Sequence, residues 1–399
     1  MRKTGIVKDK RYLKHKAGFS HPESPERLAS VYEILESPSC ARHYVRIEPR
    51  AALPEEIAYV HTPHYIDFVS STSGKSHVIL DSDTITSADT YKIALLAAGG
   101  LLNAIDAVIA GDVDNAFAFV RPPGHHAGAG NSAGFCIFNN VAIGAMHARY
   151  RHNVKKVLIV DWDLHHGNGT QKMFYADRQV LYFSTHQYPY YPGTGSWQEV
   201  GEGMGLGFTV NVPLNRGAVN GTFVAALRKI LLPIAFAYQP ELILVSAGYD
   251  IYYKDPLGSM RVTPEGFAAM TRILMDIADE CCGGKMVAVL EGGYHLGGLA
   301  QSTRATLMEM TRKGSLKARQ FKRAMILLKA DEGLSDPQIM AALNVSRPCV
   351  ERIRKRFVVD GLERALNEDP RPGQKRKLDG RAEATLIATA CTDAPEGHA

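Results

Sequence analysis

The stretch that decides the fold is Val157-Leu-Ile-Val-Asp-Trp-Asp-Leu-His-His-Gly-Asn-Gly169, in which a short apolar run leads into a polar, glycine-rich cluster. The other apolar runs that end in this way begin at Ala116, Val180, Leu242 and Met286. Their polar clusters read RPPGHH, STHQYPYYPG, SAGYD and EGGYH. Helices are expected between the runs, at 91–110, 222–238 and 264–281. Continuous apolar strands that alternate with helices predict a parallel sheet covered on both faces.

These polar clusters are expected to share one edge of the sheet. Parallel strands end at the same edge, and the ligands of such sheets bind in the crevice beyond the carboxyl ends of the strands. The sequence therefore predicts an α/β fold with a single large domain, in which a central parallel sheet is flanked by helices. The functional site is expected at this edge.

The composition indicates a soluble globular protein, because 45% of the 399 residues are hydrophobic and 22% are charged. The apolar stretch from Ile230 to Tyr238 is too short to span a bilayer. The opening MRKTGIVKDK contains no apolar signal segment. The six cysteines form no C-x-x-C pair, so neither a disulfide framework nor a thiolate zinc site is indicated. A cytoplasmic location and no contact with a membrane are expected.

The net charge divides the chain into two parts. Residues 1–312 hold 29 basic and 29 acidic side chains, whereas residues 313–399 hold 17 and 12, so the whole excess of +5 lies in the tail. With the end of the strand pattern near residue 313, this division predicts one large domain at 1–312, which carries the polar clusters, and a small all-α segment at 313–367, whose helix-turn-helix pattern is described below. A proline-rich basic linker and a truncated helical remnant are expected at 368–399. The basic tail indicates an anionic partner.

A metal site is the first function that the clusters suggest. Asp163 and His165 are two residues apart at a strand end, which points both side chains to the same side. An oxygen and a nitrogen ligand this close suit a divalent metal, most simply zinc, and catalytic zinc takes a third protein ligand. Asp250, at the end of another strand, is the best candidate. A lone D-x-H pattern is equally well explained by a helix cap and a packed histidine, but the other clusters favour the metal.

Two more clusters supply groups for acid–base chemistry. The adjacent imidazoles of RPPGHH titrate near neutral pH. Asp161 and Asn168 are placed to accept one N–H each from these rings and to fix their tautomers. Tyr294 follows two glycines that let the backbone approach a ligand, and it offers an O–H donor to a developing oxyanion. Taken separately, a rigid turn with surface histidines and a packed core tyrosine are the simpler explanations.

Seven blocks carry a family resemblance, and they occur in order: text like GHPESPERL from Ser20 to Leu28, then RPPGHHA, GFCIFNN, DWDLHHGNGTQ, FSTHQYPYYPGTG, SAGYD and LEGGY. Together they resemble the histone deacetylase and acetylpolyamine amidohydrolase family, in its bacterial, class II-like branch. The resemblance covers roughly residues 1–310. The blocks are specific to the family but not to a substrate.

The resemblance implies a role for each matching residue. The zinc ligands would be Asp163, His165 and Asp250. The catalytic residues would be His125 and His126, with Asp161 behind the first and Asn168 behind the second, and Tyr294. The structural potassium of the family would be held, partly through main-chain carbonyls, by Asp161, Asp163, His165, Ser184 and Thr185. The walls and rim of a narrow substrate tunnel would be formed by Phe135, Tyr191, Leu257, Gly134, Gly293 and Asp83.

The implied function is zinc-dependent deacetylation of acetyl-lysine, of an acetylated polyamine or of another small amine, with acetate released by a metal-activated water. Iron(II) suits the same ligands. An arginase-like two-metal enzyme needs further carboxylates, but Gly167 and Tyr252 stand where they would be. One catalytic ion is therefore expected. A catalytically inactive binder of acetyl groups would be indicated by the loss of a ligand or of Tyr294, and all of these residues are present.

The tail suggests a third class of function, DNA binding. The stretch from Ser335 to Ser346 is typical of a helix and a turn, with Ser335 as N-cap, and Ser346 with Pro348 begins a second helix. The expected DNA contacts of this helix are Arg347, Arg352 and Arg356. The segment 317–390 resembles the winged helix-turn-helix region of bacterial insertion-sequence transposases. A DNA-tethered regulatory protein and a fusion remnant both remain open, as do the substrate and the oligomeric state.

Overall fold

The computed structural model describes residues 1–312, 318–343 and 345–367. The chain divides into two compact units, Met1–Ser315 and Leu316–Ala399, each of which is described by itself. The boundary between the units lies three residues after residue 312, where the sequence places the end of the catalytic domain.

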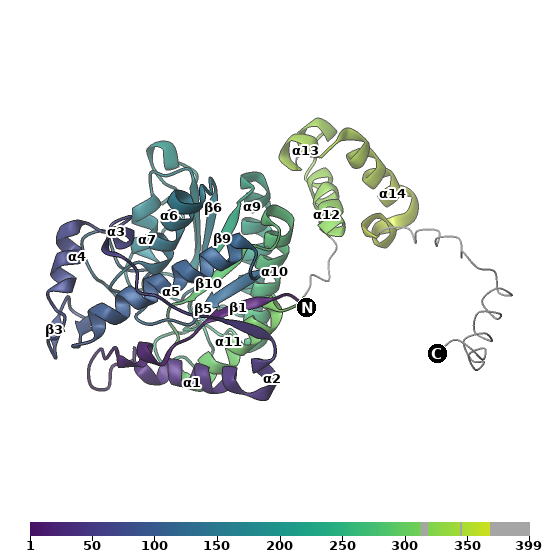
Figure 1. Cartoon of the computed structure of the whole chain (residues 1–399). Helices are drawn as coiled ribbons and strands as arrows, with labels where there is room; N and C mark the ends of the chain where they lie inside the picture. The colour runs from purple at the N-terminus through teal and green to yellow at the C-terminus, as the bar shows by residue number, and fades with distance from the viewer. Residues whose placement is uncertain (313–317, 344, 368–399) are drawn as a thin grey trace, which may run out of the picture. The chain divides into compact units, whose positions relative to one another are not determined.

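An eight-stranded sheet forms the centre of the first unit (Figure 1). Every pair of neighbouring strands in it is parallel. The order across the sheet is β2 (Tyr44–Ile47), β1 (Thr4–Val7), β5 (Asn115–Ala118), β10 (Met286–Leu290), β9 (Leu242–Ala247), β6 (Val157–Asp161), β7 (Val180–Gln187) and β8 (Thr209–Leu214). The predicted α/β fold with a central parallel sheet is confirmed.

The five strands predicted from the sequence are neighbours in the sheet, from β5 through β10, β9 and β6 to β7. Their polar clusters therefore meet at one carboxyl edge. Strand β7 continues to Gln187, four residues beyond the predicted apolar run, and all of its residues are buried. A short antiparallel pair, β3 (Val78–Ile79) and β4 (Ile85–Thr86), lies outside the main sheet.

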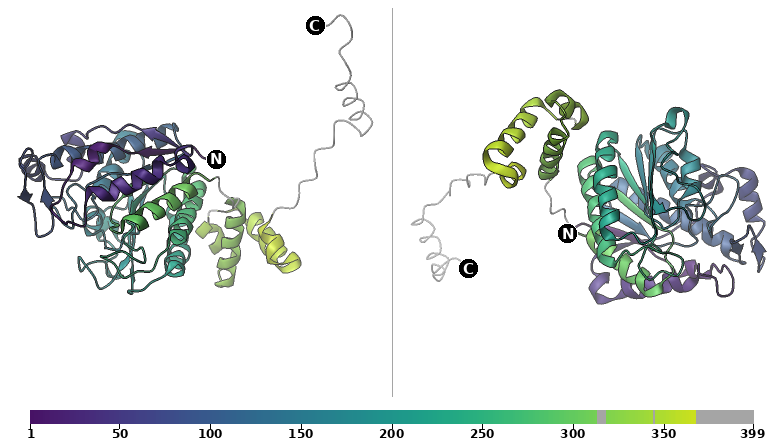
Figure 2. Two further views of the ribbon diagram at one scale, coloured as in Figure 1. Left: turned by 90° about the horizontal axis from the view of Figure 1, so that it is seen from below. Right: turned by 180° about the vertical axis from the view of Figure 1, so that it is seen from behind.

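Helices cover the sheet, and Figures 1 and 2 show it between helical layers. Helices α5 and α6 pack against each other. Helix α11 packs against both α1 and α10. The helices are η1 (Lys10–Lys14), α1 (Pro25–Glu36), α2 (Pro38–Ala41), α3 (Pro54–Ile57), α4 (Pro63–Ser70), α5 (Thr90–Ala110), α6 (Asn140–His152), α7 (Asn168–Phe174), η2 (Gly203–Gly205), α8 (Asn220–Ala226), η3 (Leu227–Leu231), α9 (Leu232–Tyr238), α10 (Pro264–Cys282) and α11 (Leu296–Met310).

Two helical stretches, Thr90–Ala110 and Asn220–Tyr238, are long and apolar enough to cross a membrane by length and composition. From the sequence, only the stretch from Ile230 was weighed as a membrane span, so neither predicted helix was considered as one. In α5, 67% of the apolar window is buried inside the protein, against 39% in the second stretch. A Cβ added at Gly99 of α5 would come within 2.2 Å of the Arg50 carbonyl oxygen, so the helix packs directly against backbone. This packing is that of a core helix of the α/β unit.

The second unit contains the helices α12 (Ala318–Asp331), α13 (Asp336–Leu343) and α14 (Arg347–Leu366). They enclose a core of their own, made by Ile326, Ile339, Val350 and Ile353. The small all-α tail predicted from the sequence is confirmed. The predicted linker and helical remnant at 368–399 lie outside the described residues.

Candidate active site

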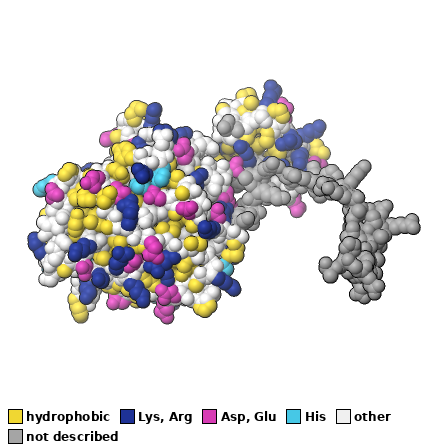
Figure 3. All heavy atoms as spheres, in the orientation of Figure 1, with side chains coloured by type: hydrophobic (Ala, Val, Ile, Leu, Met, Phe, Trp, Pro, Cys, Tyr) yellow, Lys and Arg dark blue, Asp and Glu magenta, His cyan; other side chains and the backbone are white. Residues whose placement is uncertain are grey.

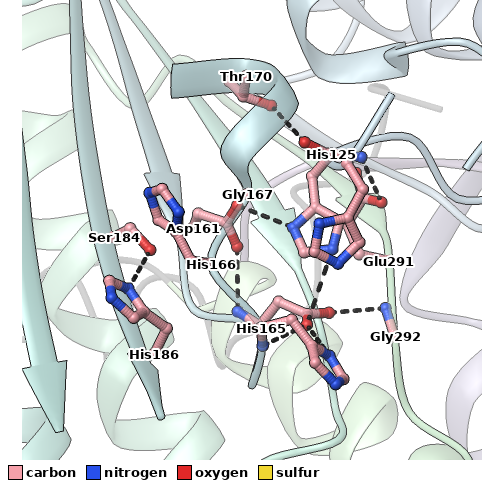
Figure 4. A network of polar contacts seen from close by, with 12 residues as sticks. His125, Asp161, His165, His166, Gly167, Thr170, Ser184, His186, Glu291 and Gly292 are labelled. Carbon is pink, nitrogen blue, oxygen red and sulfur yellow. Dashed lines mark hydrogen bonds and ion pairs between the residues drawn. The ribbon is translucent and has the colours of Figure 1, made fainter. Parts of the chain in front are cut away.

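The carboxyl ends of four adjacent strands bring the predicted catalytic residues together (Figure 4). The histidine pair follows β5, and the DWDLHH cluster ends β6. Asp250 follows β9, and the EGGYH cluster follows β10. Parallel strands that end side by side therefore assemble residues that lie up to 169 positions apart, as with His125 and Tyr294.

Asp163, His165 and Asp250 converge on one point. The Nδ1 atom of His165 lies 3.2 Å from Oδ1 of Asp163 and 3.1 Å from Oδ2 of Asp250. One ligand atom from each residue lies within 4.8 Å of the other two. Both aspartates are fully buried, and the His165 side chain is 12% exposed.

Backbone N–H groups hold the two carboxylates in this arrangement. Leu164 N–H donates to Oδ1 of Asp250 over 2.8 Å, and Gly292 N–H donates to Oδ2 of Asp163 over 2.8 Å. A Cβ added at Gly292 would come within 2.3 Å of an Asp250 oxygen and 2.6 Å of an Asp163 oxygen. Only glycine therefore lets the β10 loop lie this close to both carboxylates.

The charges in this cluster are shifted by burial and by one another. Burial raises the pKa of Asp250 to about 7, and the neighbouring Asp163 carboxylate adds to the rise. Burial alone would lower the pKa of His165, but the hydrogen bonds to the two aspartates outweigh it and raise the pKa to about 9. Both shifts arise because two carboxylates are buried next to one another.

A divalent cation fits these three residues. A metal ligand must be the neutral form of His165, and in that form the two buried carboxylates need another cation, because buried charges are usually paired or coordinate a metal. Two oxygens and one nitrogen form a ligand set that zinc and iron(II) accept. The histidine pair lies beside these ligands, with the ring centroids of His126 and His165 5.8 Å apart.

His125 is held by a carboxylate behind it. Its Nδ1–H donates to Oδ2 of Asp161 over 3.0 Å, and the Tyr182 O–H donates to the same oxygen over 3.2 Å. Burial alone would lower the pKa of His125, but the carboxylates of Asp161 and Asp163 outweigh it and raise the pKa to about 10. His125 is thus the member of the pair that favours the protonated form.

His126 differs because its partner is an amide. Its Nδ1 lies 2.8 Å from Oδ1 of Asn168, so Nδ1 carries the hydrogen and Nε2 keeps a free lone pair. Burial lowers the pKa of His126 well below its usual range, and the charges of His125 and His165 lower it further. A neutral imidazole with a free Nε2 is suited to accept a proton.

Tyr294 lies two residues after Gly292, whose N–H donates to the ligand Asp163. Its ring meets Phe135 edge-on, with ring centroids 5.9 Å apart, and the Arg27 guanidinium carbon lies 4.8 Å from the ring centroid. Burial raises the pKa of the Tyr294 phenol well above its usual range. The phenol therefore keeps its proton and remains a hydrogen-bond donor.

Ser184 and Thr185, the remaining residues of the implied potassium site, are buried in β7. Ser184 Oγ lies 2.9 Å from Nδ1 of His186, whose Nε2–H donates to the Gly195 carbonyl. The Ser184 hydrogen is therefore directed to His186, which leaves the lone pairs of Oγ available. Oγ1 of Thr185 is buried without a hydrogen-bond partner among the described residues. Ser184 pairs with Asp161 across β6 and β7, so an alkali cation beside that carboxylate would fit the Ser184 oxygens.

Aromatic rings lie beside His126 and His165. Tyr191 meets His126 edge-on at 5.2 Å and His165 at 5.9 Å between ring centroids. Tyr190, which the sequence analysis did not single out, stacks on His165 with ring centroids 5.7 Å apart. With Phe135 beside Tyr294, these rings can hold the apolar part of an extended substrate.

The structure gives the rim residues contacts of their own. Asp83 accepts a hydrogen bond from Gly134 N–H over 3.1 Å, so it positions the loop that carries Phe135. Gly134 has a φ of 54°, and a Cβ there would come within 2.3 Å of the His126 ring. Leu257 accepts the Tyr190 O–H through its carbonyl over 2.8 Å.

Several residues that hold the site in place were not identified from the sequence. Glu291, the first residue of its cluster, accepts the N–H groups of Gly124 and His125. Asp255 accepts the N–H groups of Tyr294 and His295. Arg27 donates to the carbonyls of Glu291 and Gly293. They act on backbone rather than on ligand atoms, so no motif spacing marks them.

The predicted DNA contacts lie on α14. Ser346 precedes this helix and Pro348 occupies its first turn, but the Ser346 side chain makes no capping hydrogen bond. Successive residues of a helix turn by about 100°, which separates Arg347 from Arg356 by roughly half a turn. Arg352 and Arg356 therefore share one face, whereas Arg347 lies elsewhere and pairs with Glu351 over 2.9 Å. The three predicted contacts therefore do not all lie on one face of α14.

Ser335 stands at the expected N-cap position, but its hydroxyl donates to a side chain. Helix α13 begins at Asp336, directly after this serine. The Ser335 backbone N–H and its hydroxyl both donate to Oε1 of Gln338. The side chain of Gln338 thus satisfies the start of the helix, as in one half of a capping box.

Comparisons with known proteins agree with this arrangement. A model of the histone deacetylase domain matches residues 21–310, and a model of a winged helix-turn-helix matches residues 323–384. Both resemblances noted in the sequence are thereby confirmed.

Individual relatives give the same result. A probable deacetylase of Archaeoglobus fulgidus is 42% identical over 74% of this chain and 82% of its own length. The human polyamine deacetylase HDAC10 is 44% identical over 72% of this chain, but the match covers only 44% of the human protein. The crystal structure of the HDA15 HD domain matches with a TM-score of 0.75 and 38% identity, over 79% of this chain and 91% of that one.

Proposed function

Because this chain belongs to the histone deacetylase family, we propose that it is a zinc-dependent amidohydrolase that removes acetyl groups from amines. The observation that carries the proposal is the convergence of Asp163, His165 and Asp250 beside a histidine with a free Nε2. The products would be acetate and the free amine.

Zinc, when bound by these three residues, would polarise the amide carbonyl and lower the pKa of a water molecule toward ~7. Nε2 of His126 is placed to accept the proton of the attacking water, because its Nδ1 is committed to Asn168. The same ring can then donate that proton to the departing amine nitrogen. His125, held in the protonated form by Asp161, would add positive charge beside the reacting groups.

Tyr294 would stabilise the oxygen that becomes negative as water adds to the carbonyl carbon. A phenol that stays protonated can donate to this oxygen, and Asp255 and Arg27 fix the loop that carries it. Phe135 and Tyr191 would hold the alkyl chain of the amine. A potassium ion held near Ser184 and Thr185 would stabilise the carboxyl end of β6, where Asp161 lies.

The substrate class is tested by assaying acetate release from acetyl-lysine peptides and from acetylated polyamines, with zinc and iron content measured on the same sample. We expect the wild type to hydrolyse at least one class and His126→Ala to be inactive on both. A fully metal-loaded wild type that binds acetylated amines without releasing acetate would instead identify an inactive acetyl-group binder.

We also propose that the tail binds DNA. The winged helix-turn-helix match and the separate core of α12 to α14 support this function. Lys and Arg side chains lie on the visible surface of the tail unit (Figure 3). Arg352 is exposed on the same face of α14 as Arg356. A single unit of this kind makes few phosphate contacts and reads little sequence.

The tail is expected to bind duplex DNA weakly, with a Kd of about 10⁻⁴–10⁻⁶ M at physiological salt, and this affinity should fall steeply as salt rises because counterions are released. Arg352→Ala should weaken binding in fluorescence anisotropy, whereas Arg42→Ala, an exposed arginine of the catalytic unit, should not. A chain that ends after Ser315 should keep its deacetylase activity. Salt-independent binding, or none, would favour a fusion remnant.

A further inference from the structure

A second group of metal-ligand side chains lies away from the deacetylase site. His147 and His152 of α6 and Asp106 of α5 bring three ligand atoms within 4.8 Å of one another. Oδ1 of Asp106 lies 2.7 Å from Nε2 of His147 and 2.6 Å from Nε2 of His152. Helix α6 begins after Asn139, near the histidine pair, and its last residue lies shortly before β6 begins at Val157. The cluster is therefore at the amino edge of the sheet, opposite the deacetylase site.

The hydrogen count of this cluster is unfavourable while both imidazoles are neutral. If both imidazoles donate to Asp106, each Nε2 carries a hydrogen, and Nδ1 of a neutral ring is then an acceptor. Nδ1 of His147 is buried without a hydrogen-bond partner among the described residues, and it lies 3.9 Å from Oε1 of Glu56. A buried acceptor that faces a carboxylate oxygen is unfavourable.

A divalent ion at the Nε2 atoms removes this conflict. The ion replaces the hydrogens on Nε2, so the hydrogen of the His147 ring moves to Nδ1 and is directed at Glu56. Metal-bound histidines usually donate their other N–H to a carboxylate or a carbonyl in this way. Glu56 is fixed for such a role, because both nitrogens of the Arg50 guanidinium fork donate to its oxygens over 2.6 Å and Leu53 N–H donates to one of them.

The burial of the three side chains also suits a bound ion. His147 is 4% exposed, whereas His152 is 23% and Asp106 is 39% exposed. His147 is thus fixed inside the protein, whereas His152 and Asp106 face solvent. An ion, and the water that completes its coordination, can enter from that side. Two imidazoles and one carboxylate suit zinc, cobalt, nickel or copper, whereas magnesium and calcium prefer oxygen ligands.

We propose that Asp106, His147 and His152 form a second, non-catalytic site for a divalent transition metal, with Glu56 as the carboxylate behind His147. A bound ion would tie α5 to α6 at the amino edge of the sheet. This site does not depend on the proposed deacetylase function.

The test uses the full chain with Asp250→Ala, which removes a ligand from the deacetylase site. The protein is dialysed against buffered zinc, and bound zinc is measured by elemental analysis. Asp250→Ala alone should hold one zinc ion per chain, and zinc should raise its Tm. Adding His147→Gln, His152→Gln or Asp106→Asn should abolish both effects, whereas adding His64→Gln, an exposed histidine of α4, should change neither.

Two results would overturn the proposal. The first is that Asp250→Ala binds no zinc. The second is that the added substitutions at the cluster leave the zinc content of the protein unchanged. Either result would mean that the cluster binds no metal and is held together by hydrogen bonds alone. His147 is more buried than His152, so His152→Gln is the variant that removes a ligand with less disturbance of the fold. Acetate release by His152→Gln in the otherwise wild-type chain should remain at the wild-type level, so a failure of the deacetylase proposal would be seen separately.

Discussion

Replacing Asp250 by alanine is expected to empty the deacetylase metal site and to abolish acetate release. Catalytic zinc depends on three protein ligands, and only Asp163 and His165 would remain. The Lewis-acid contribution of such an ion is several kcal/mol, and each 1.36 kcal/mol is tenfold in rate, so kcat/KM should fall by at least about 10³-fold. The measurement is acetate release from the best substrate, with bound metal determined on the same protein.

Asp250→Asn tests the ligand charge more specifically than Asp250→Ala does. Its amide oxygen can still accept the Leu164 N–H, so the loop after β9 is preserved while the ligand charge is removed. Asp67→Ala, which removes an exposed carboxylate of α4, is the matched control and should retain metal and activity. An Asp250→Ala protein that kept its catalytic rate would show that the metal ligands are assigned wrongly.

Tyr294→Phe should give the second-largest effect, a fall in kcat of about 10²–10³-fold with metal content unchanged. The phenol would donate to an oxygen that becomes negative only as water adds, so its loss should lower kcat far more than it changes KM. Steady-state kinetics on the purified variant, with metal content and Tm measured in parallel, check both parts of the expectation.

Tyr249→Phe is the matched control for this substitution. The Tyr249 ring packs against Phe267 in the core, with ring centroids 4.8 Å apart, so the loss of its hydroxyl should leave kcat near the wild-type value. A Tyr294→Phe protein with wild-type kcat would remove Tyr294 from the reaction. A large loss of metal in this variant would mean that the tyrosine acts on the fold of the site rather than on the reacting oxygen.

The sequence predicted the centre of the sheet better than its edges. The five strands from β5 to β7 are continuous apolar runs because helices cover both of their faces. β1, β2 and β8 were missed, since β1 is only four residues long and β2 and β8 are partly exposed and mix polar with apolar side chains. The end of β7 was missed for another reason: Ser184 and His186 are polar, yet they are buried and hydrogen-bonded to each other.

The candidate site was predictable where residues act through side chains at fixed spacings. Asp163, His165 and Asp250 meet as the strand-end argument requires. Asp255 and Arg27 could not be found in this way, because they hold the Tyr294 loop through its backbone. The cluster of Asp106 with His147 and His152 was also not predicted. Its residues lie inside two helices rather than at strand ends, and the two histidines are five residues apart within α6.

The central claim is that acetate release requires one ion at the site formed by Asp163, His165 and Asp250. The most direct test is to titrate zinc into metal-depleted full-length protein while bound zinc and acetate release are measured at every step. His152→Gln is used as the host, so that zinc at the second cluster does not enter the count. We expect no acetate release without metal. The rate should rise in proportion to bound zinc and saturate at one ion per chain. Acetate release by the metal-free protein, or saturation only at two ions, would contradict it.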